Sequence, residues 1–142
     1  MSGRTTEEPS HLDGLPWGMR IDDHGPHRVL HVDSAGPRLS TETDAVDLVG
    51  EAFGADASVL VVPVSRLDPA FLDLSTRRAG EFAQKLVNYR LQLVVLGDVG
   101  RHEAASAAFR DWVRESNRGR HVWFVPDEGT LAARLAATGP RG

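Results

Sequence analysis

The amino-acid sequence predicts a single α/β domain with a mixed, mostly parallel sheet, an N-terminal hairpin and about four helices. The alternation of apolar patterns and the chain length support this fold class, and the lack of cysteine narrows the possible chemistry. Apolar runs rich in β-branched residues alternate with segments in which apolar residues recur every three or four positions. The 142 residues suffice for one domain with a core but not for two ordinary ones. The chain has no cysteine, which excludes a disulfide framework, a thiol nucleophile and cysteine-ligated metal sites.

The N-terminal region predicts a tail followed by a β-hairpin. Residues 1–16 are polar and aperiodic, and Trp17 is the first large apolar residue that can pin this tail to the domain. Residues 18–22 and 28–32 are short strand candidates, and the turn-forming residues 23–26 separate them.

The first helix is expected to open at residues 40–44 and to end at Gly54. Ser40 or Thr41 can cap it, and acidic residues in its first turn favour the positive end of the helix dipole. Its inner face is expected to consist of Ala45, Leu48, Val49, Ala52 and Phe53.

Three apolar runs further along the chain predict strands, at residues 59–64, 91–96 and 121–125. Pro63 lacks a backbone N–H, so it should lie at a strand end or at a bulge. Helices are expected from Ser75 or Thr76 to about Tyr89, from about Glu103 to Ser116, and from residues 126–128 onward. Their inner faces are expected to be Ala79, Phe82, Ala83 and Leu86; Ala105, Ala108, Phe109, Trp112 and Val113; and Leu131, Ala132 and Leu135.

These elements predict one folded domain over residues 17–137, with flexible ends at residues 1–16 and 138–142. Strands that alternate with helices of this length are typical of a parallel sheet joined by right-handed crossovers. No internal repeat or second domain is evident.

Composition and missing motifs exclude several function classes. A net charge of −4 argues against a dedicated nucleic-acid-binding protein. The chain has neither a signal-peptide pattern nor an apolar run long enough to span a membrane, so we expect a cytoplasmic protein. Nucleotide-binding glycine motifs, histidine spacings for metal ligation and a nucleophile-elbow serine are absent. We therefore predict no cofactor, no metal and no catalytic residues, and an enzymatic activity stays undecided.

Ser75, Thr76, Arg77 and Arg78 form a candidate anion or phosphorylation site. A helix N-terminus offers free N–H groups to a phosphate, and the two arginines can pair with it. The simpler alternative is an ordinary helix cap, which stabilises by about 1 kcal/mol without any modification.

A candidate interaction surface follows on the same helix and on the next one, at Glu81, Lys85, Asn88, Arg90, Arg114 and Arg118. The first three residues fall at helical spacing and share a face. Arg110, Arg114 and Arg118 are four positions apart and form a basic stripe with acidic residues between them. The alternative to a binding surface is an ordinary solvated helix face.

The loops at residues 68–76 and 97–102 are a second candidate site, because ligands bind at the carboxyl ends of parallel strands. Asp68, Asp73 and His102 are acid–base candidates there if the fold brings them together. The alternative is a pair of ordinary strand-to-helix connections.

Three segments, at residues 66–76, 79–90 and 115–120, resemble hallmark segments of the bacterial domain of unknown function 4180 family. This resemblance covers about residues 17–135 and implies no particular activity. The order of the elements also resembles the STAS fold of anti-sigma-factor antagonists, whose regulatory serine corresponds in position to Ser75 or Thr76. The Asp-Ser-Ser-Gly type of motif of those proteins is replaced here by residues 73–76.

Together these observations predict a non-enzymatic protein-interaction or regulatory module that binds a protein partner or self-associates. The alternative is a small-molecule or anion-binding domain, with or without enzymatic activity, that uses loops 68–76 and 97–102. Nucleic-acid binding through the arginine stripe is a weaker third hypothesis.

Overall fold

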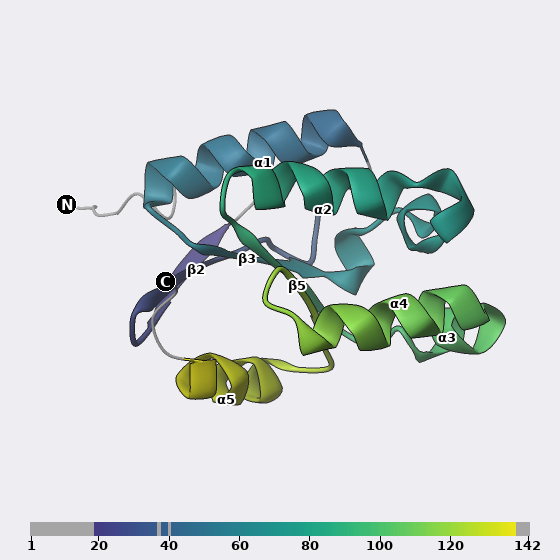
Figure 1. The fold of residues 1–142 in the computed structure, drawn as a ribbon. Helices are drawn as coiled ribbons and strands as arrows, with labels where there is room; N and C mark the ends of the chain where they lie inside the picture. The colour runs from purple at the N-terminus through teal and green to yellow at the C-terminus, as the bar shows by residue number, and fades with distance from the viewer. Residues whose placement is uncertain (1–18, 37, 40, 139–142) are drawn as a thin grey trace.

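The computed structural model describes residues 19–138 except residues 37 and 40 (Figure 1). Its strands form one five-stranded sheet in the order β1-β2-β3-β4-β5. They are β1 (Arg20–His24), β2 (His27–His31), β3 (Val59–Pro63), β4 (Gln92–Leu96) and β5 (Val122–Val125). β1 pairs antiparallel with β2, and all other neighbours are parallel. The predicted mixed sheet with its N-terminal hairpin is confirmed.

Five α-helices accompany the sheet: α1 (Glu42–Ala55), α2 (Arg78–Asn88), α3 (Gly100–Ala105), α4 (Ala107–Arg118) and α5 (Glu128–Thr138). Because the parallel strands follow one another in sequence order, right-handed crossovers place the connecting helices on one face. α5 comes after the last strand and lies on the opposite side of the sheet from α1 and α2 (Figure 1).

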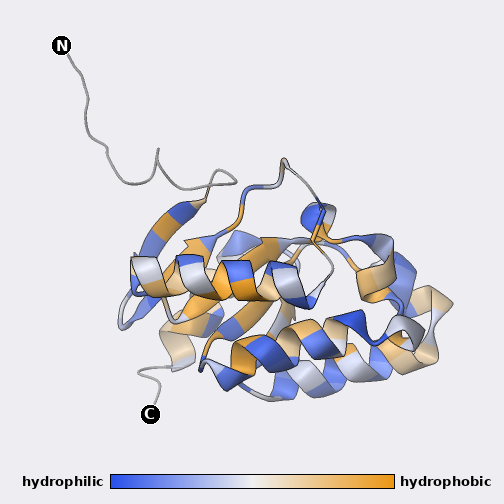
Figure 2. Cartoon of the chain, turned by 90° about the horizontal axis from the view of Figure 1, so that it is seen from above, coloured by the Kyte–Doolittle hydropathy of each residue, from blue (hydrophilic) through white to orange (hydrophobic). Residues whose placement is uncertain are grey.

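Each face of the sheet has its own core. The larger core joins α1, α2 and α4 to strand residues such as Leu60 and Phe124. The smaller core joins Leu131 and Leu135 of α5 to Val61 and Trp123. The strands β3, β4 and β5 are mostly orange in Figure 2, whereas the hairpin strands and the helices carry both blue and orange residues. Burial on both faces explains why β3, β4 and β5 are continuous apolar runs.

The predicted strands lie within two residues of the observed ones. Pro63 is the last residue of β3, where its missing N–H costs no hydrogen bond inside the ladder. Val64, predicted to continue this strand, instead begins a 3₁₀ turn (Val64–Arg66).

The first helix differs from its prediction at the C-terminal end. Thr41 caps α1, and a reciprocal bond from the Thr41 N–H to Asp44 completes a capping box. The last helical residue is Ala55, and the C-cap residue Asp56 adopts the left-handed conformation, so the helix continues past Gly54, its predicted end. Phe53 was expected to face the core but is 58% exposed, and its ring packs edge-on against Tyr89 at 5.7 Å.

The single helix predicted over residues 103–116 is two helices, α3 and α4. Ser106 has extended backbone angles between them, and its hydroxyl accepts a hydrogen bond from the Phe109 N–H at 3.1 Å. This cap satisfies an N–H that begins a new helix, which explains the break. Ala105 and Ala108 are exposed as a result, whereas Phe109 and Val113 are buried as predicted.

The connection between β3 and α2 is built from three 3₁₀ turns, Val64–Arg66, Pro69–Leu72 and Leu74–Thr76. α2 therefore begins at Arg78, later than predicted, and Arg77 occupies its N-cap position in the left-handed region with a φ of 62°. The inner face predicted for this helix is confirmed, because Ala79, Phe82, Ala83 and Leu86 are all buried.

Arg66 attaches the loop after β2 to this connection. Its side chain is fully buried, and Nη1 donates hydrogen bonds to the carbonyl oxygens of Asp33 at 2.8 Å and Ala35 at 3.0 Å. Beside it, Leu39 and Leu67 form an isolated parallel bridge. These contacts hold together the carboxyl ends of β2 and β3.

The prediction of flexible ends covers residues 1–16 and 138–142, and of these only Thr138 is described, as the last residue of α5. The anchoring role of Trp17 and the capping role of Ser40 also lie outside the described residues. None of the helices in the described part of the chain has the length and apolar character that crossing a bilayer requires.

Candidate functional site

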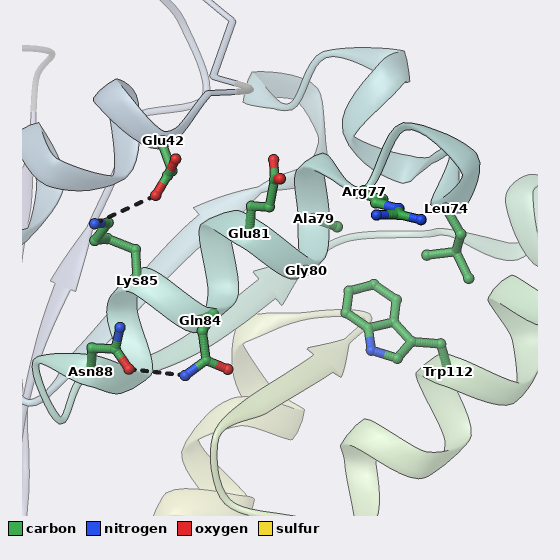
Figure 3. A pocket seen from close by; sticks show the side chains of 10 residues that line it. All are labelled: Glu42, Leu74, Arg77, Ala79, Gly80, Glu81, Gln84, Lys85, Asn88 and Trp112. Atoms are coloured by element: carbon green, nitrogen blue, oxygen red, sulfur yellow. Dashed lines mark hydrogen bonds and ion pairs between the residues drawn. The ribbon is translucent and has the colours of Figure 1, made fainter.

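A groove of about 560 Å³ lies beside α2, and Trp112 of α4 forms its opposite wall (Figure 3). Its apolar lining comes from three elements and consists of Leu74, Ala79, Gly80 and Trp112. Its polar lining consists of Glu42, Arg77, Glu81, Gln84, Lys85 and Asn88. A volume of this size, with an apolar wall and a few polar groups, is typical of a binding site.

The amphipathic pattern of α2 creates the groove. Phe82 and Leu86 point into the core, so Glu81, Gln84 and Asn88 are exposed on the other side. Gly80 has no side chain, and a Cβ built there would meet no atom within 4 Å. The groove is therefore open to solvent at this point of the helix.

Two polar contacts order one end of the groove. Lys85 Nζ lies 3.4 Å from Glu42 Oε2, which ties α2 to the start of α1. Gln84 Nε2 donates a hydrogen bond to Asn88 Oδ1 at 2.9 Å along α2. Both pairs are drawn in Figure 3. These four side chains have partners within the protein, so they shape the rim more than they attract a ligand.

Arg77 and Glu81 are different, because within the described part of the chain neither side chain has a hydrogen bond or an ion pair. In Figure 3, the Arg77 guanidinium lies on the same side as Leu74 and Trp112. The groove thus combines one cation and one carboxylate that lack partners with a half-buried tryptophan. Such a site can bind a group that is partly apolar and partly charged.

The structure brings together Arg77, Glu81, Lys85 and Asn88 of the predicted site residues. The other predicted surface residues do not line the groove. Arg114 lies 3.6 Å from Asp111, Arg118 lies 3.7 Å from Glu115, and Arg90 follows the end of α2 with a φ of 62°. The acidic neighbours on α4 partly neutralise the basic stripe.

Ser75 and Thr76 lie in the 3₁₀ turn before α2 and not at its N-cap. The Ser75 hydroxyl donates to Asp73 Oδ1 at 2.7 Å, and the Thr76 hydroxyl donates to the Ala70 carbonyl at 2.6 Å. The hydrogen bonds from Ser75 lower the pKa of Asp73, which keeps a negative charge beside this hydroxyl. A phosphate on Ser75 would be repelled by that charge, so the geometry favours a structural role, and the phosphorylation site stays a prediction.

The loop at residues 97–102 borders a separate cavity of about 240 Å³. Gly97, Asp98 and Val99 line it together with side chains of α4 and β5, and no residue of the 68–76 loop takes part. Asp98 Oδ1 accepts a hydrogen bond from the Gly100 N–H at 2.8 Å. The two loops predicted to form one mouth therefore do not share this cavity.

The proposed acid–base residues have local structural roles. Asp68 and Asp73 each accept a hydrogen bond that begins a 3₁₀ turn, from Ala70 and Ser75 respectively. The ring of His102 packs edge-on against Phe109 at 6.0 Å. Nothing in these contacts pairs one of the three with another.

Sequence reasoning missed Trp112, Leu74 and Glu42 as residues of the groove. Trp112 packs against the core as expected, with its ring centroid 5.3 Å from that of Phe124. It is only half-buried, however, and its other side faces α2 and lines the groove. A tryptophan at the edge of an amphipathic stripe is a usable signal, because this large side chain rarely fits completely into a core.

The model of the family described as Domain of unknown function (DUF4180) matches residues 24–135. This chain belongs to the DUF4180 family. No curated protein and no solved structure matches the chain. The resemblance of the three sequence segments to this family is thus confirmed, whereas the similarity to the STAS fold stays a prediction.

Those three segments have distinct places in the DUF4180 domain. Residues 66–76 contain the second and third 3₁₀ turns, and residues 79–90 contain most of α2. Residues 115–120 include Asn117 at the end of α4, whose Oδ1 accepts a hydrogen bond from the Phe124 N–H at 2.7 Å. The first two segments therefore border the groove, and the third anchors the last strand.

Proposed function

We propose that this DUF4180 domain is a non-enzymatic protein-interaction module whose groove between α2 and α4 binds a short segment of a partner protein. The carrying observation is that one open groove combines Trp112 and Leu74 with Arg77, whose side chain has no partner among the described residues. Tryptophan and arginine are the residues that most often dominate binding energy at protein interfaces.

The chemistry of the groove supports a partner segment of defined character. An apolar side chain of the partner would cover Trp112, Leu74 and the open space beside Gly80. A neighbouring carboxylate would accept hydrogen bonds from the Arg77 guanidinium, which offers planar, paired donors. We therefore expect a segment with an aliphatic or aromatic anchor next to an acidic residue.

The residue types of the described groove lining support a non-enzymatic role over hydroxyl- or imidazole-based catalysis. The groove lining that the structure describes contains no serine, threonine or histidine to pair as nucleophile and base. The module would be regulatory if one partner displaced another from the groove. The resemblance of its order of elements to the STAS fold favours such a role.

The test is a peptide selection with the wild-type chain as the target. A displayed library of random 12-residue peptides is selected on the protein, and the affinities of enriched peptides are measured by fluorescence anisotropy. We expect enriched peptides to carry an apolar residue beside an acidic one. Gly80→Leu fills the groove, and Arg77→Asn removes the cation while tolerating the left-handed backbone.

Each of these two variants should weaken binding by about tenfold or more, the loss of one interface hot spot. Arg114→Ala, on the outer side of α4, is the matched control and should bind as wild type does. The proposal fails if no peptide is enriched, or if enriched peptides bind Gly80→Leu as tightly as the wild type. A wild-type dimer that Gly80→Leu converts to a monomer would instead identify a second copy of the chain as the occupant.

The alternative of a small-molecule or anion-binding domain has less support. The cavity beside residues 97–99 has no lining residue from the 68–76 loop, and it is smaller than most ligand sites. Enriched peptides that compete with inorganic phosphate for Arg77 would favour this alternative.

A further inference from the structure

The hairpin at the N-terminal edge of the sheet carries a cluster of imidazole and carboxylate groups. Asp22 and His24 are two residues apart on β1, so their side chains share a face of the sheet. His31 lies on the same face of β2, diagonally across from Asp22, whose direct partner is Val29. This is the face that α5 covers, as the bond from Arg20 to Glu128 of α5 indicates.

The three side chains converge on one point. One ligand atom from each, an imidazole nitrogen or a carboxylate oxygen, lies within 4.8 Å of the other two. His31 Nε2 is 3.2 Å from Asp22 Oδ2, and His24 Nε2 is 3.9 Å from the same oxygen. Ligand atoms around a tetrahedral zinc ion with bonds of about 2.0–2.1 Å lie roughly 3.3 Å apart. The separation between His31 and Asp22 matches this value, and His24 has to move closer to Asp22 to complete the site.

His31 gives an independent indication that a ligand belongs there. The residue is 6% exposed, and its Nε2 is fully buried without a hydrogen-bond partner among the described residues. A buried polar nitrogen without a partner is costly, and it requires an explanation such as a bound ion. This nitrogen lies 3.2 Å from Asp22 Oδ2, inside the cluster.

We propose that Asp22, His24 and His31 bind a divalent transition-metal ion of the Zn²⁺ class. Two imidazoles and one carboxylate are the donor set of many zinc sites that keep a fourth position open. His24 is partly exposed, which gives the ion a route of entry from solvent.

Among the three proposed ligands, His31 also lines a cavity of about 410 Å³. This cavity lies at the carboxyl ends of β2, β3 and β4, and its polar lining includes His31, Arg20, Asp33 and Glu128. A water molecule or an oxygen of a small anion can complete the coordination from this side, and Arg20 is placed to attract an anion.

Arg20 is the main competitor of the ion. Its Nη1 lies 2.6 Å from Asp22 Oδ2, and its Nη2 lies 3.2 Å from Glu128 Oε1. A carboxylate has two oxygens with two lone pairs each, so Asp22 can bind an ion and retain Arg20. In that arrangement Arg20 orients the carboxylate, and Glu128 offsets the positive charge of the guanidinium.

The site differs from the sequence prediction of no metal, which relied on histidine spacing along the chain. The ligands come together only because the hairpin places residue 31 beside residue 22. No other such group of three histidine and acidic residues is present in the part of the chain that the structure describes.

The test is a titration of tag-free, metal-free protein with ZnCl₂ by isothermal calorimetry. A parallel titration with CoCl₂ reports coordination through the visible absorption of tetrahedral Co²⁺. We expect one ion per chain, and we expect His24→Gln and His31→Gln each to weaken binding by about tenfold or more. His121→Gln, an exposed histidine on a distant turn, is the matched control and should leave the affinity unchanged.

Because His31 is buried, circular dichroism checks whether His31→Gln still folds. If it does not, His24→Gln decides the test, because His24 is partly exposed and its replacement is less disruptive to the fold. The proposal is wrong if the wild type binds no ion at one equivalent, or if His24→Gln binds Zn²⁺ as tightly as wild type. Loss of Zn²⁺ binding in His121→Gln alone would also overturn it. None of these results depends on the peptide groove.

Discussion

The guanidinium of Arg66 packs directly against the backbone of Gly36. A Cβ built at residue 36 would lie 3.0 Å from both Cζ and Nη1 of Arg66, closer than most real Cβ contacts, so the guanidinium would have to move by a few tenths of an ångström. Gly36 also has a φ of 133°, a backbone conformation that other residues rarely adopt. Glycine at residue 36 therefore lets the loop after β2 cover the buried arginine without strain.

Gly36→Ala should lower the free energy of unfolding by about 1–3 kcal/mol, because it adds both backbone strain and a clash with a buried side chain. Urea denaturation measures this difference. Gly50→Ala is the control, because Gly50 lies on an exposed turn of α1 with open space around it. It should stabilise by about 0.5–1 kcal/mol, and equal effects of the two substitutions would contradict the argument.

Arg66→Lys should cost about 2–3 kcal/mol of stability despite the conserved charge. The lysine ammonium cannot reproduce the planar donors that reach the carbonyls of Asp33 and Ala35, and an unsatisfied buried carbonyl is costly. Arg114→Lys on the exposed face of α4 should change stability by less than about 0.5 kcal/mol. Thermal or urea unfolding of both variants measures this difference. Similar small losses of stability in the two variants would show that the Arg66 hydrogen bonds do not stabilise the fold.

Gly80→Ala should stabilise the protein by about 0.5–1 kcal/mol. Gly80 lies inside α2, where glycine is unfavourable, and a Cβ there meets no other atom. The expected result is a higher midpoint of thermal unfolding with an unchanged spectrum. If Gly80→Ala instead destabilises the protein, the added methyl group meets other atoms, and the groove is closed in solution.

The stability of the metal-free protein should fall in mild acid because of His31. Burial lowers the pKa of His31 below its ordinary value of 6.5, Arg20 lowers it further, and Asp22 and Glu128 partly offset this. A histidine with a lowered folded-state pKa contributes stability above about pH 6.5, and the contribution is lost as the pH falls through the lower folded value. Urea unfolding between pH 5 and 8 should show a smaller loss for His31→Gln than for wild type, and parallel curves would refute this.

Thr41→Ala should lower the free energy of unfolding by about 1 kcal/mol, because it removes the hydroxyl that accepts from the Asp44 N–H at 3.2 Å. Thr43→Ala is the control, because Thr43 lies two residues further along the chain and is exposed inside the same helix. Chemical denaturation of both variants provides the comparison. If the control loses as much as Thr41→Ala, the loss does not come from the cap.

Much of the fold could be predicted because local patterns carry it. The run at residues 59–64 has apolar residues on both of its faces, and only a central strand buries both faces. The inner face of α2 was predicted correctly because four apolar residues recur at helical spacing. Helix ends were predicted less well, because a side chain such as Ser106 or a backbone such as that of Asp56 can end a helix without a distinctive sequence signal.

The candidate sites were predicted only in part, for the same physical reason. Spacing along one helix was enough to place Glu81, Lys85 and Asn88 on a common face. It could not show that Trp112, from a different helix, forms the opposite wall of a groove.

By itself, the sequence determined the class of fold, the order of strands and helices and the faces that are buried, because these follow from hydrophobic periodicity within short segments. The tertiary structure alone decided that His31 lies beside Asp22, that Arg66 lies against Gly36 and that Trp112 faces α2. Such contacts depend on which strands and helices become neighbours, and residues far apart in sequence meet only when the whole core has formed.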